Sequence, residues 1–545
     1  MTENSCIYHA AELASKSLLH RLDRDASFRP FFHLMVKDGV MRAGHASWDC
    51  ADMSGRFVDA WILMRQMADW PMTEEEEGVR RYLLGLQAED GLFYDQSPLP
   101  GPPPQAGREI PDTADMFCQS RALMGLTSWL LESGEFAIQQ RIERLIEGLW
   151  QIAVKKDDFC YYPGHRYSPK GWEGVSAYAY KDLGHRALPA YGTLQILPLT
   201  RYWEVTGSPS AERLIRGLLN FFVRESGVIA EDGTFTGHLH SWGILPSTVG
   251  VLRYAMAIED ERLIQWCKRV YDFIVANSGS FGWLPDGIGV DDGIETGETC
   301  CITDLIHLGV KLAECGHADC LDYVEVMARN QLIENQIRDV SRFTFDSPEI
   351  EAMTLGAYDS WVMPNGLTGC SELGLEGCCT ASAVRAIYLA WEHAINVSEN
   401  QVRVNLMLSR RSEWVDTMDF QPFEGRFSVL VHKPIEVLIR VPRWIERTSL
   451  GLTVDGMERP LVWAGSFLKV DGIPGSRIDL EFPIPERHTE EEIRGRAYQL
   501  FWRGITLMRI EPPGETYPIF QRTLDGMAAC SMDLDRLKTK PLVEW

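Results

Sequence analysis

The stretch AYGTLQILPLTRYWEVTGSPSAERLIRGLLNFFVRES, residues 190–226, contains two helical patterns separated by a turn. Apolar residues recur three and four positions apart in 190–207 and again in 210–226, which is the period of a helix with one buried face. Between the two patterns, Gly207 is a turn former and Ser208 is a residue that can cap the next helix. The stretch therefore predicts a helical hairpin.

Similar paired patterns occupy most of residues 1–397 and predict roughly twelve helices. Longer connections, rich in glycine, proline and aromatic residues, separate the pairs. Hairpins that repeat roughly every fifty residues are typical of a closed ring, and about six of them would form an (α/α)6 toroid. In such a ring the long connections gather at one end and build a cleft. The patterns lie at 11–22, 56–70, 76–90, 116–132, 136–154, 190–207, 210–226, 244–258, 261–277, 300–314, 320–337 and 379–395.

After about residue 398 the period of the pattern becomes two. Segments such as QVRVNLML (401–408), GRFSVLVH (425–432) and IEVLIRVP (435–442) alternate apolar and polar residues and are bounded by glycine, proline or aspartate. Many short strands of this kind are typical of a β-sandwich. The sequence thus predicts a multidomain α plus β protein, with an (α/α)6 barrel catalytic domain at 1–397 and a β-sandwich with a C-terminal tail at 398–545.

Charge and composition exclude several classes of partner. The chain has 545 residues and a formal net charge of −24, and a surface this acidic repels the phosphates of nucleic acids. It contains no apolar run of about 18 residues or more, so we expect no membrane span. The N-terminal residues lack the pattern of a secretion signal, and the 13 cysteines are odd in number with no disulfide-like spacing. We therefore expect a protein of the reducing cytoplasm.

Two stretches each place a pair of cysteines after a glutamate, namely GETCC at 297–301 and EGCC at 376–379. Glu298 and Cys300 stand at the start of one expected helix, and Cys378 and Cys379 stand at the start of another. Helix N-termini favour negative ligands, including thiolates. Three soft sulfurs and one carboxylate form a plausible tetrahedral zinc site if the two helix starts meet. The alternative is that these are core cysteines near helix starts.

A metal at this site would have particular chemistry. Three sulfurs leave zinc little Lewis acidity for activating water, so the site suggests either a structural role or a thiolate nucleophile held by zinc. Cys301 and Glu376 are expected to be bystanders, the first in helix packing and the second at a loop end. A further group in AECGHADC (313–320), formed by Cys315, His317 and Cys320, is interpreted as a turn and not as a metal site.

Other polar and aromatic residues in the long connections are candidates for contacting a substrate. His238, His240 and Trp242 in TGHLHSWG (236–243) resemble a sugar-contacting loop, although a structural histidine pair is the alternative. His185 precedes a helix and is expected to face the same cleft, and Tyr358 completes this predicted set. The loop before Glu298 also carries acidic residues, one of which could serve as a general acid: Asp286, Asp291, Asp292 and Glu295.

Taken together, the ETC and CC helix starts and the following sandwich resemble glycoside hydrolase family 127, the β-L-arabinofuranosidase family. The resemblance continues in ARNQLIENQI (328–337), LIRVPRWIE (438–446) and FWRGITLMRIEPPGETYPIFQR (501–522), and it covers about residues 40–525. It implies an (α/α)6 barrel, a zinc cofactor and a cysteine nucleophile. It also implies a small carbohydrate or glycoside as substrate.

Carried over to this sequence, the resemblance implies that Glu298, Cys300, Cys378 and Cys379 are the zinc ligands and that Cys378 is the nucleophile. The sulfur would attack the anomeric carbon, and water would then hydrolyse the thioglycosyl-enzyme with retention. His185 and His238 resemble sugar-binding histidines of the family.

The sequence departs from the family pattern at the general acid/base. The family has a glutamate in the loop before ETC, whereas the corresponding stretch here reads SGSFGW, with Ser280 in its place. Serine cannot protonate a leaving group, so we expect an acidic residue of the following loop to substitute for it, and we choose Asp292. The residue after ETC, Cys301, is a second and milder departure from the pattern.

Two other functions remain open from the sequence. The first is another sugar-acting enzyme on the same toroid, a lyase or epimerase, with His238, His240 or Tyr178 as the base. The second is a non-catalytic carbohydrate-binding relative in which zinc is structural, which the missing glutamate favours. A homodimer is a further expectation for any of these functions.

Overall fold

The protein is described here by a computed structural model, which covers residues 6–46, 50–95, 113–164, 166–172, 192–236, 239–288, 296–368, 374–398 and 400–528. In the stretch that predicts a hairpin, α7 ends at Thr206 and Gly207 follows with a φ of 66°. Ser208 then caps α8, because its Oγ accepts a hydrogen bond from Ala211 N at 3.3 Å. These two helices confirm the hairpin.

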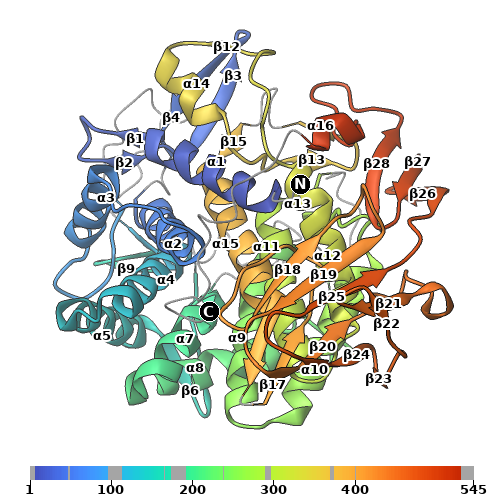
Figure 1. The fold of residues 1–545 in the computed structure, drawn as a ribbon. Helices are drawn as coiled ribbons and strands as arrows, with labels where there is room; N and C mark the ends of the chain where they lie inside the picture. The colour runs from blue at the N-terminus through green and yellow to red at the C-terminus, as the bar shows by residue number, and fades with distance from the viewer. Residues whose placement is uncertain are drawn as a thin grey trace.

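Six helices form a closed ring, as the hairpin repeat predicts, and Figure 1 labels each of them. Each packs against the next along the chain, and the last, α15, returns to the first, α2. Almost every residue of α2, α9, α11 and α15 is buried, which is expected for helices that line the inside of a toroid. The inner helices are α2 (Ala51–Met67), α4 (Met116–Ser133), α7 (Ile196–Thr206), α9 (Ser241–Ala257), α11 (Thr299–Glu314) and α15 (Gly377–Ala394).

A second layer of helices covers this ring from outside. Each outer helix packs against the inner helix that precedes it, and α1, from the other end of the chain, covers α15. Three of the outer helices, at 136–152, 209–220 and 261–276, bury one face only, as their amphipathic sequences predict. They are α1 (Cys6–His20), α3 (Glu74–Gly85), α5 (Phe136–Ile152), α8 (Pro209–Asn220), continued by a π-helical turn at Phe221–Glu225, α10 (Glu261–Ala276) and α12 (Cys320–Arg329).

Glycine permits one close approach inside the ring. A Cβ atom at Gly55 of α2 would lie 2.1 Å from the carbonyl oxygen of Arg121 in α4, and one at Gly125 would lie 2.4 Å from the carbonyl oxygen of Gly55. Any larger residue at either position would push these two inner helices apart.

Two five-stranded sheets follow the ring and share one apolar core, which makes them a sandwich (Figure 1). Neighbouring strands are antiparallel except β17 and β20, which are parallel. Alternate residues of β19, Phe427, Val429 and Val431, point into the core, as the period of two predicts. One sheet has the order β16 (Ile395–Ser398), β17 (Gln401–Val404), β20 (Ile435–Arg440), β24 (Phe467–Gly472) and β23 (Trp463–Ala464); the other has β18 (Val415–Asp419), β19 (Arg426–Val431), β25 (Arg477–Glu481), β21 (Gly451–Val454) and β22 (Met457–Glu458).

A third apolar cluster joins the C-terminal strands to the loops of the ring. Leu500 and Ile510 of the third sheet pack in one cluster with Leu34 and Trp283. This sheet consists of β26 (Glu486–Ile493), β27 (Arg496–Arg503) and β28 (Thr506–Glu511), and the short helix α16 (Leu524–Ala528) follows it. Because the C-terminal strands pack on the ring, the division into domains at 397/398 stays a prediction.

The connections of the ring form small elements of their own. β15 (Leu375–Glu376) leads directly into α15, and β10 (Leu239–His240) pairs with β11 (Gly287–Ile288) just before α9. None of the helices in the described ranges is long and apolar enough to cross a membrane. The remaining elements are β1 (Leu22–Asp23), β2 (Arg29–Pro30), β3 (His33–Lys37), β4 (Val40–Gly44), β5 (Ala114–Asp115), β6 (Val154–Lys156), β7 (Phe159–Tyr161), β8 (Arg166–Ser168), β9 (Gly171–Trp172), α13 (Gln331–Glu334), β12 (Thr344–Phe345), α14 (Pro348–Thr354), β13 (Val362–Met363), β14 (Gly366–Leu367) and a 3₁₀ turn at Arg447–Ser449.

Candidate metal and active site

The two cysteine pairs meet because the helices that begin with them are neighbours in the ring. Glu298 immediately precedes α11, and Cys300 lies in its first turn. Cys378 and Cys379 lie in the first turn of α15, which packs directly against α11. The ring therefore brings the four predicted ligands together, although they are almost eighty residues apart in the sequence.

The distances between these four donors fit a four-coordinate metal ion. The sulfur of Cys379 lies 3.4 Å from that of Cys300, 4.0 Å from that of Cys378 and 3.7 Å from Oε1 of Glu298. Tetrahedral bonds of zinc-like length would separate two sulfurs by about 3.8 Å and a sulfur from an oxygen by about 3.5 Å. All four donor atoms lie within 4.8 Å of one another, so this three-sulfur cluster could hold a metal ion.

Arg56 of α2 provides a positive charge on one side of the cluster. Its Nη1 lies 3.9 Å from the sulfur of Cys300, and its Nε donates a 2.9 Å hydrogen bond to Asp52. Burial acts to raise the pKa of Cys300, but hydrogen bonds from Cys378 and Cys379 and the charge of Arg56 hold it well below the ordinary value.

Cys301 and Glu376, which are expected to be bystanders, both contact groups of the cluster, and Cys301 is buried in helix packing as expected. The sulfur of Cys301 lies 3.6 Å from Oε2 of Glu298, and the sulfur of Cys378 lies 3.5 Å from Oε2 of Glu376. Burial raises the pKa of Glu376 to about 7. Helix geometry could have revealed Cys301, because it follows Glu298 by three residues and positions i and i+3 share a helix face.

His240 and Asp286 approach the cluster from the loop side. The short β10–β11 pairing places His240 opposite Gly287, next to Asp286. His240 Nε2 lies 2.8 Å from Oε2 of Glu298, and it also forms an ion pair with Oδ1 of Asp286. Asp286 is buried, whereas His240 is part-exposed. Asp286 is one of the four acidic residues in this loop that could serve as a general acid, and no pattern in the loop sequence distinguishes it from the other three.

Trp242 and Tyr358, two of the predicted substrate contacts, are buried. The ring of Trp242 packs against Phe117 and lies under the guanidinium groups of Arg56 and Arg121, whose centres are 5.3 Å and 4.8 Å from its centroid. Tyr358 is fully buried, and its backbone N–H donates to Thr380 Oγ1 at 3.0 Å. Their roles in binding stay predictions.

Some predicted residues lie outside the part of the chain that the structure describes. These are His185, His238 and Asp292, together with the alternatives Asp291, Glu295 and Tyr178. Their predicted roles therefore stay predictions.

Ser280, which the resemblance aligns with a family glutamate, is exposed. Its backbone N–H donates a 2.9 Å hydrogen bond to Glu491 of β26, and its hydroxyl donates to the same carboxylate. These contacts tie Ser280 to the third sheet.

The AECGHADC segment forms a turn between α11 and α12, as interpreted from the sequence. The backbone N–H of His317 donates to Leu312 O, and that of Cys320 donates to His317 O. Across the described ranges, two groups of side chains are arranged as potential metal ligands, and neither includes Cys315, His317 or Cys320.

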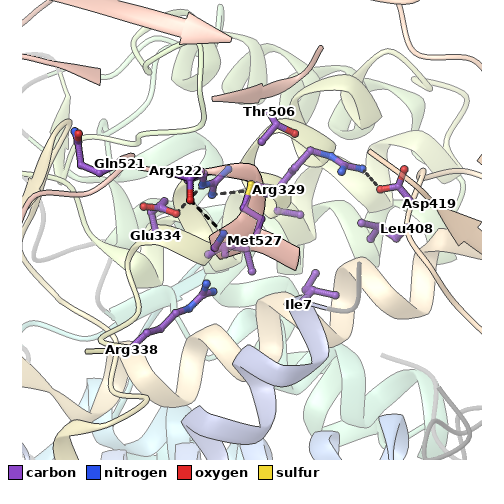
Figure 2. Close-up of a pocket in the computed structure, with 14 residues that line it drawn as sticks. Ile7, Arg329, Glu334, Arg338, Leu408, Asp419, Thr506, Gln521, Arg522 and Met527 are labelled. Carbon is purple, nitrogen blue, oxygen red and sulfur yellow. Dashed lines mark hydrogen bonds and ion pairs between the residues drawn. The ribbon is translucent and has the colours of Figure 1, made fainter. Parts of the chain in front are cut away.

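A separate cavity of about 230 Å³ lies where the ring, the sandwich and the C-terminal segment meet (Figure 2). Four of its charged side chains form two ion pairs. Arg522 Nε lies 2.7 Å from Glu334, and Arg329 lies 2.7 Å from Asp419. No residue of the three-sulfur cluster lines this cavity, and its ion pairs join the sheets to the ring.

The fold is shared with glycoside hydrolases of known structure. No protein-family model and no curated protein sequence matches this chain. A GH127 β-L-arabinofuranosidase from Geobacillus stearothermophilus T6 superposes with a TM-score of 0.60 and 14% identity, over 92% of this chain and 80% of that one. A second GH127 β-arabinofuranosidase superposes with a TM-score of 0.63 and 15% identity, over 93% and 81% of the two chains. A third chain, described as a glycoside hydrolase, superposes with a TM-score of 0.56 and 13% identity, over 84% of this chain and 77% of that one.

Proposed function

We propose that this protein is a retaining glycoside hydrolase in which Cys378 is the nucleophile and zinc is the bound metal. One observation carries the proposal: Cys378 is the least buried of the clustered cysteines, with 5% of the residue exposed, whereas Cys300, Cys301 and Cys379 are at 1% or less. A nucleophile must be reachable by substrate, and a purely structural ligand need not be. The shared fold with GH127 enzymes supports the same assignment.

Zinc suits the donor set of Glu298, Cys300, Cys378 and Cys379, because thiolates and a carboxylate at these spacings are its preferred ligands. When bound, it would keep the thiols deprotonated at neutral pH. The sulfur of Cys378 then attacks the anomeric carbon, the bond from that carbon to the leaving oxygen breaks, and a protein acid protonates this oxygen. Water next gives a proton to the same group, now deprotonated, attacks the same carbon and releases the sulfur as a thiolate, so two inversions give net retention.

The acid remains to be chosen among the carboxylates of the site. Asp292 is the choice from the sequence, and Asp286 and Glu376 are the candidates that lie beside the ligands in the described part of the chain. Asp292→Asn, Asp286→Asn and Glu376→Gln should be compared on two aryl glycosides. The variant that lacks the acid should lose activity on a glycoside with a poor leaving group. It should retain most of its activity on a glycoside of 4-nitrophenol or of a more acidic phenol, because such a leaving group needs little protonation.

The activity itself is tested by a panel of aryl glycosides that includes β-L-arabinofuranosides. We expect turnover by the zinc-loaded wild type and a loss of about 10³-fold or more in Cys378→Ala. Cys267→Ala removes a buried cysteine of the outer helix α10 and serves as the matched control, with activity unchanged. A sugar adduct on Cys378, found by mass spectrometry after a slow substrate, would identify the nucleophile. Absence of turnover on every glycoside with zinc bound would contradict the proposal.

A further inference from the structure

A second group of potential ligands lies beside the three-sulfur cluster. The ligand atoms of His240, Asp286, Glu298 and Cys301 all lie within 4.8 Å of one another. We propose that these four residues form a second metal site, which shares Glu298 with the first and takes a divalent cation such as zinc. This proposal goes beyond the glycosidase activity and does not depend on it.

The carboxylate of Glu298 faces both groups. Its Oε1 lies 3.7 Å from the sulfur of Cys379, in the three-sulfur cluster. Its Oε2 lies 2.8 Å from His240 Nε2 and 3.6 Å from the sulfur of Cys301, in the second group. A carboxylate that presents one oxygen to each of two donor groups can bridge two metal ions, which in protein sites usually lie about 3.5–4 Å apart.

The four side chains of the second group are arranged better for binding a cation than for hydrogen bonding to one another. A single nitrogen, His240 Nε2, faces Oε2 of Glu298 and Oδ1 of Asp286 together. One ring nitrogen carries at most one hydrogen, so it cannot donate fully to both carboxylates. A metal ion can accept electron pairs from the nitrogen, both carboxylates and the thiolate at once, and a set of one N, one S and two O donors is within the range that zinc binds.

The backbone holds these donors in place. β10 pairs with β11, and the backbone N–H of Ser241 donates to the carbonyl oxygen of Asp286 at 2.6 Å. The backbone N–H of Asp286 donates in turn to Thr296 O at 2.9 Å. Cys301 and Glu298 are fixed by the start of α11. His240 and Cys301 lie in secondary structure, and Asp286 and Glu298 immediately precede it. Less conformational entropy is therefore lost when a metal binds than in an unstructured loop.

Metal content of the full-length protein tests this proposal. Protein purified without chelator and supplied with zinc is passed through a desalting column, and zinc per chain is counted by inductively coupled plasma and native mass spectrometry. We expect two zinc ions in the wild type and in the control Cys267→Ala. We expect one in Cys301→Ala and one in Asp286→Asn, because each variant removes a ligand that the first site does not use.

A single zinc in the wild type would overturn the proposal, as would two zinc ions retained in both Cys301→Ala and Asp286→Asn. The wild type alone decides the question if a variant fails to fold. Cobalt(II) added to metal-free protein should raise the thiolate-to-cobalt absorbance until two equivalents are bound, and saturation at one equivalent would exclude the second site. An absence of glycosidase activity leaves the zinc count unchanged, so the two proposals can fail separately.

Discussion

The three-sulfur cluster and the junction between ring and sandwich are both buried and polar, but they balance their charges differently. At the junction, Arg440 of β20 forms ion pairs with Asp322 and Glu325 of α12, so opposite charges meet. In the cluster, thiols and carboxylates meet one another, and the guanidinium group of Arg56 lies 3.9 Å from the sulfur of Cys300. A protein interior tolerates charge that is paired. Acidic donors gathered in this way could hold a cation supplied from outside.

Removal of a metal from the three-sulfur cluster should have the largest effect on the stability of the protein. We expect a chelator to lower the apparent melting temperature of the wild type by about 10 °C, because binding energy at a structural metal site is also folding energy. Differential scanning calorimetry before and after chelation measures the shift. Cys379→Ala lacks one donor and should show a much smaller change. An unchanged melting temperature in protein proved metal-free would show that the cluster needs no cation.

Removal of one partner of the Arg440–Glu325 ion pair at the junction should have the next largest effect on stability. Arg440→Ala leaves Glu325, a fully buried carboxylate, without its closest cation, and breaking such a pair costs about 3–5 kcal/mol. Urea unfolding measures the loss. The double variant Arg440→Met with Glu325→Leu replaces the pair by apolar groups and should recover most of the stability. Equal instability of the single and double variants would contradict this account.

Removal of Arg56 tests how much the cluster depends on its guanidinium neighbour. We expect Arg56→Ala to weaken zinc binding by about 10–100-fold, which is usual for a residue that supports a metal ligand. Competition with a chromophoric chelator measures the affinity. Arg56→Lys retains the charge and should lose less, so an affinity that is the same in both variants would mean that packing alone explains the effect.

An ion pair at the C-terminal ends of α11 and α15, far from the cysteines, should have a smaller, pH-dependent effect on stability. Glu314 of α11 lies 3.0 Å from His393 of α15. Burial acts to raise the pKa of Glu314, but the hydrogen bond to His393 and the charge of Lys311 lower it to about 2. A depressed carboxyl pKa stabilises the fold above its unfolded value of about 4.5, and this stability is lost as the pH falls toward 2. The difference in melting temperature between wild type and Glu314→Gln should therefore shrink below pH 4.5, and a constant difference would contradict the assignment.

Ser280 should give the smallest effect of all. It lies outside both regions, is exposed and contacts Glu491, so Ser280→Ala should change glycosidase activity by less than about twofold. The ratio kcat/KM on the best aryl glycoside measures this. A large loss would mean that Ser280 acts in the reaction despite its position.

Much of the fold could be predicted because it follows from local periodicity. The spacing of apolar residues predicts the hairpins, and the number of hairpins predicts a closed ring. Convergence of the cysteine pairs was also predictable, because both stand at helix starts and the helices are neighbours in the ring. The parallel pairing of β17 with β20 was not, since alternation along a strand does not determine its neighbour.

The surroundings of the cluster were harder to predict than its ligands. Asp286 reaches the site only because β11 pairs with β10, and a two-residue strand leaves no pattern in the sequence. Glu376 reaches Cys378 through the direction of a single side chain at a helix start. Such contacts depend on how loops fold over one end of the ring, and loops carry no periodicity.

The position of the metal ligands also determines when the site can exist during protein synthesis. Cys378 and Cys379 belong to α15, the last inner helix of the ring, and α15 packs against α2 and α1 from the start of the chain. A ribosome releases the chain from its N-terminus, so five inner helices emerge before the helix that completes the ring. The four donors can therefore come together only after α15 has been synthesised and has packed against α11.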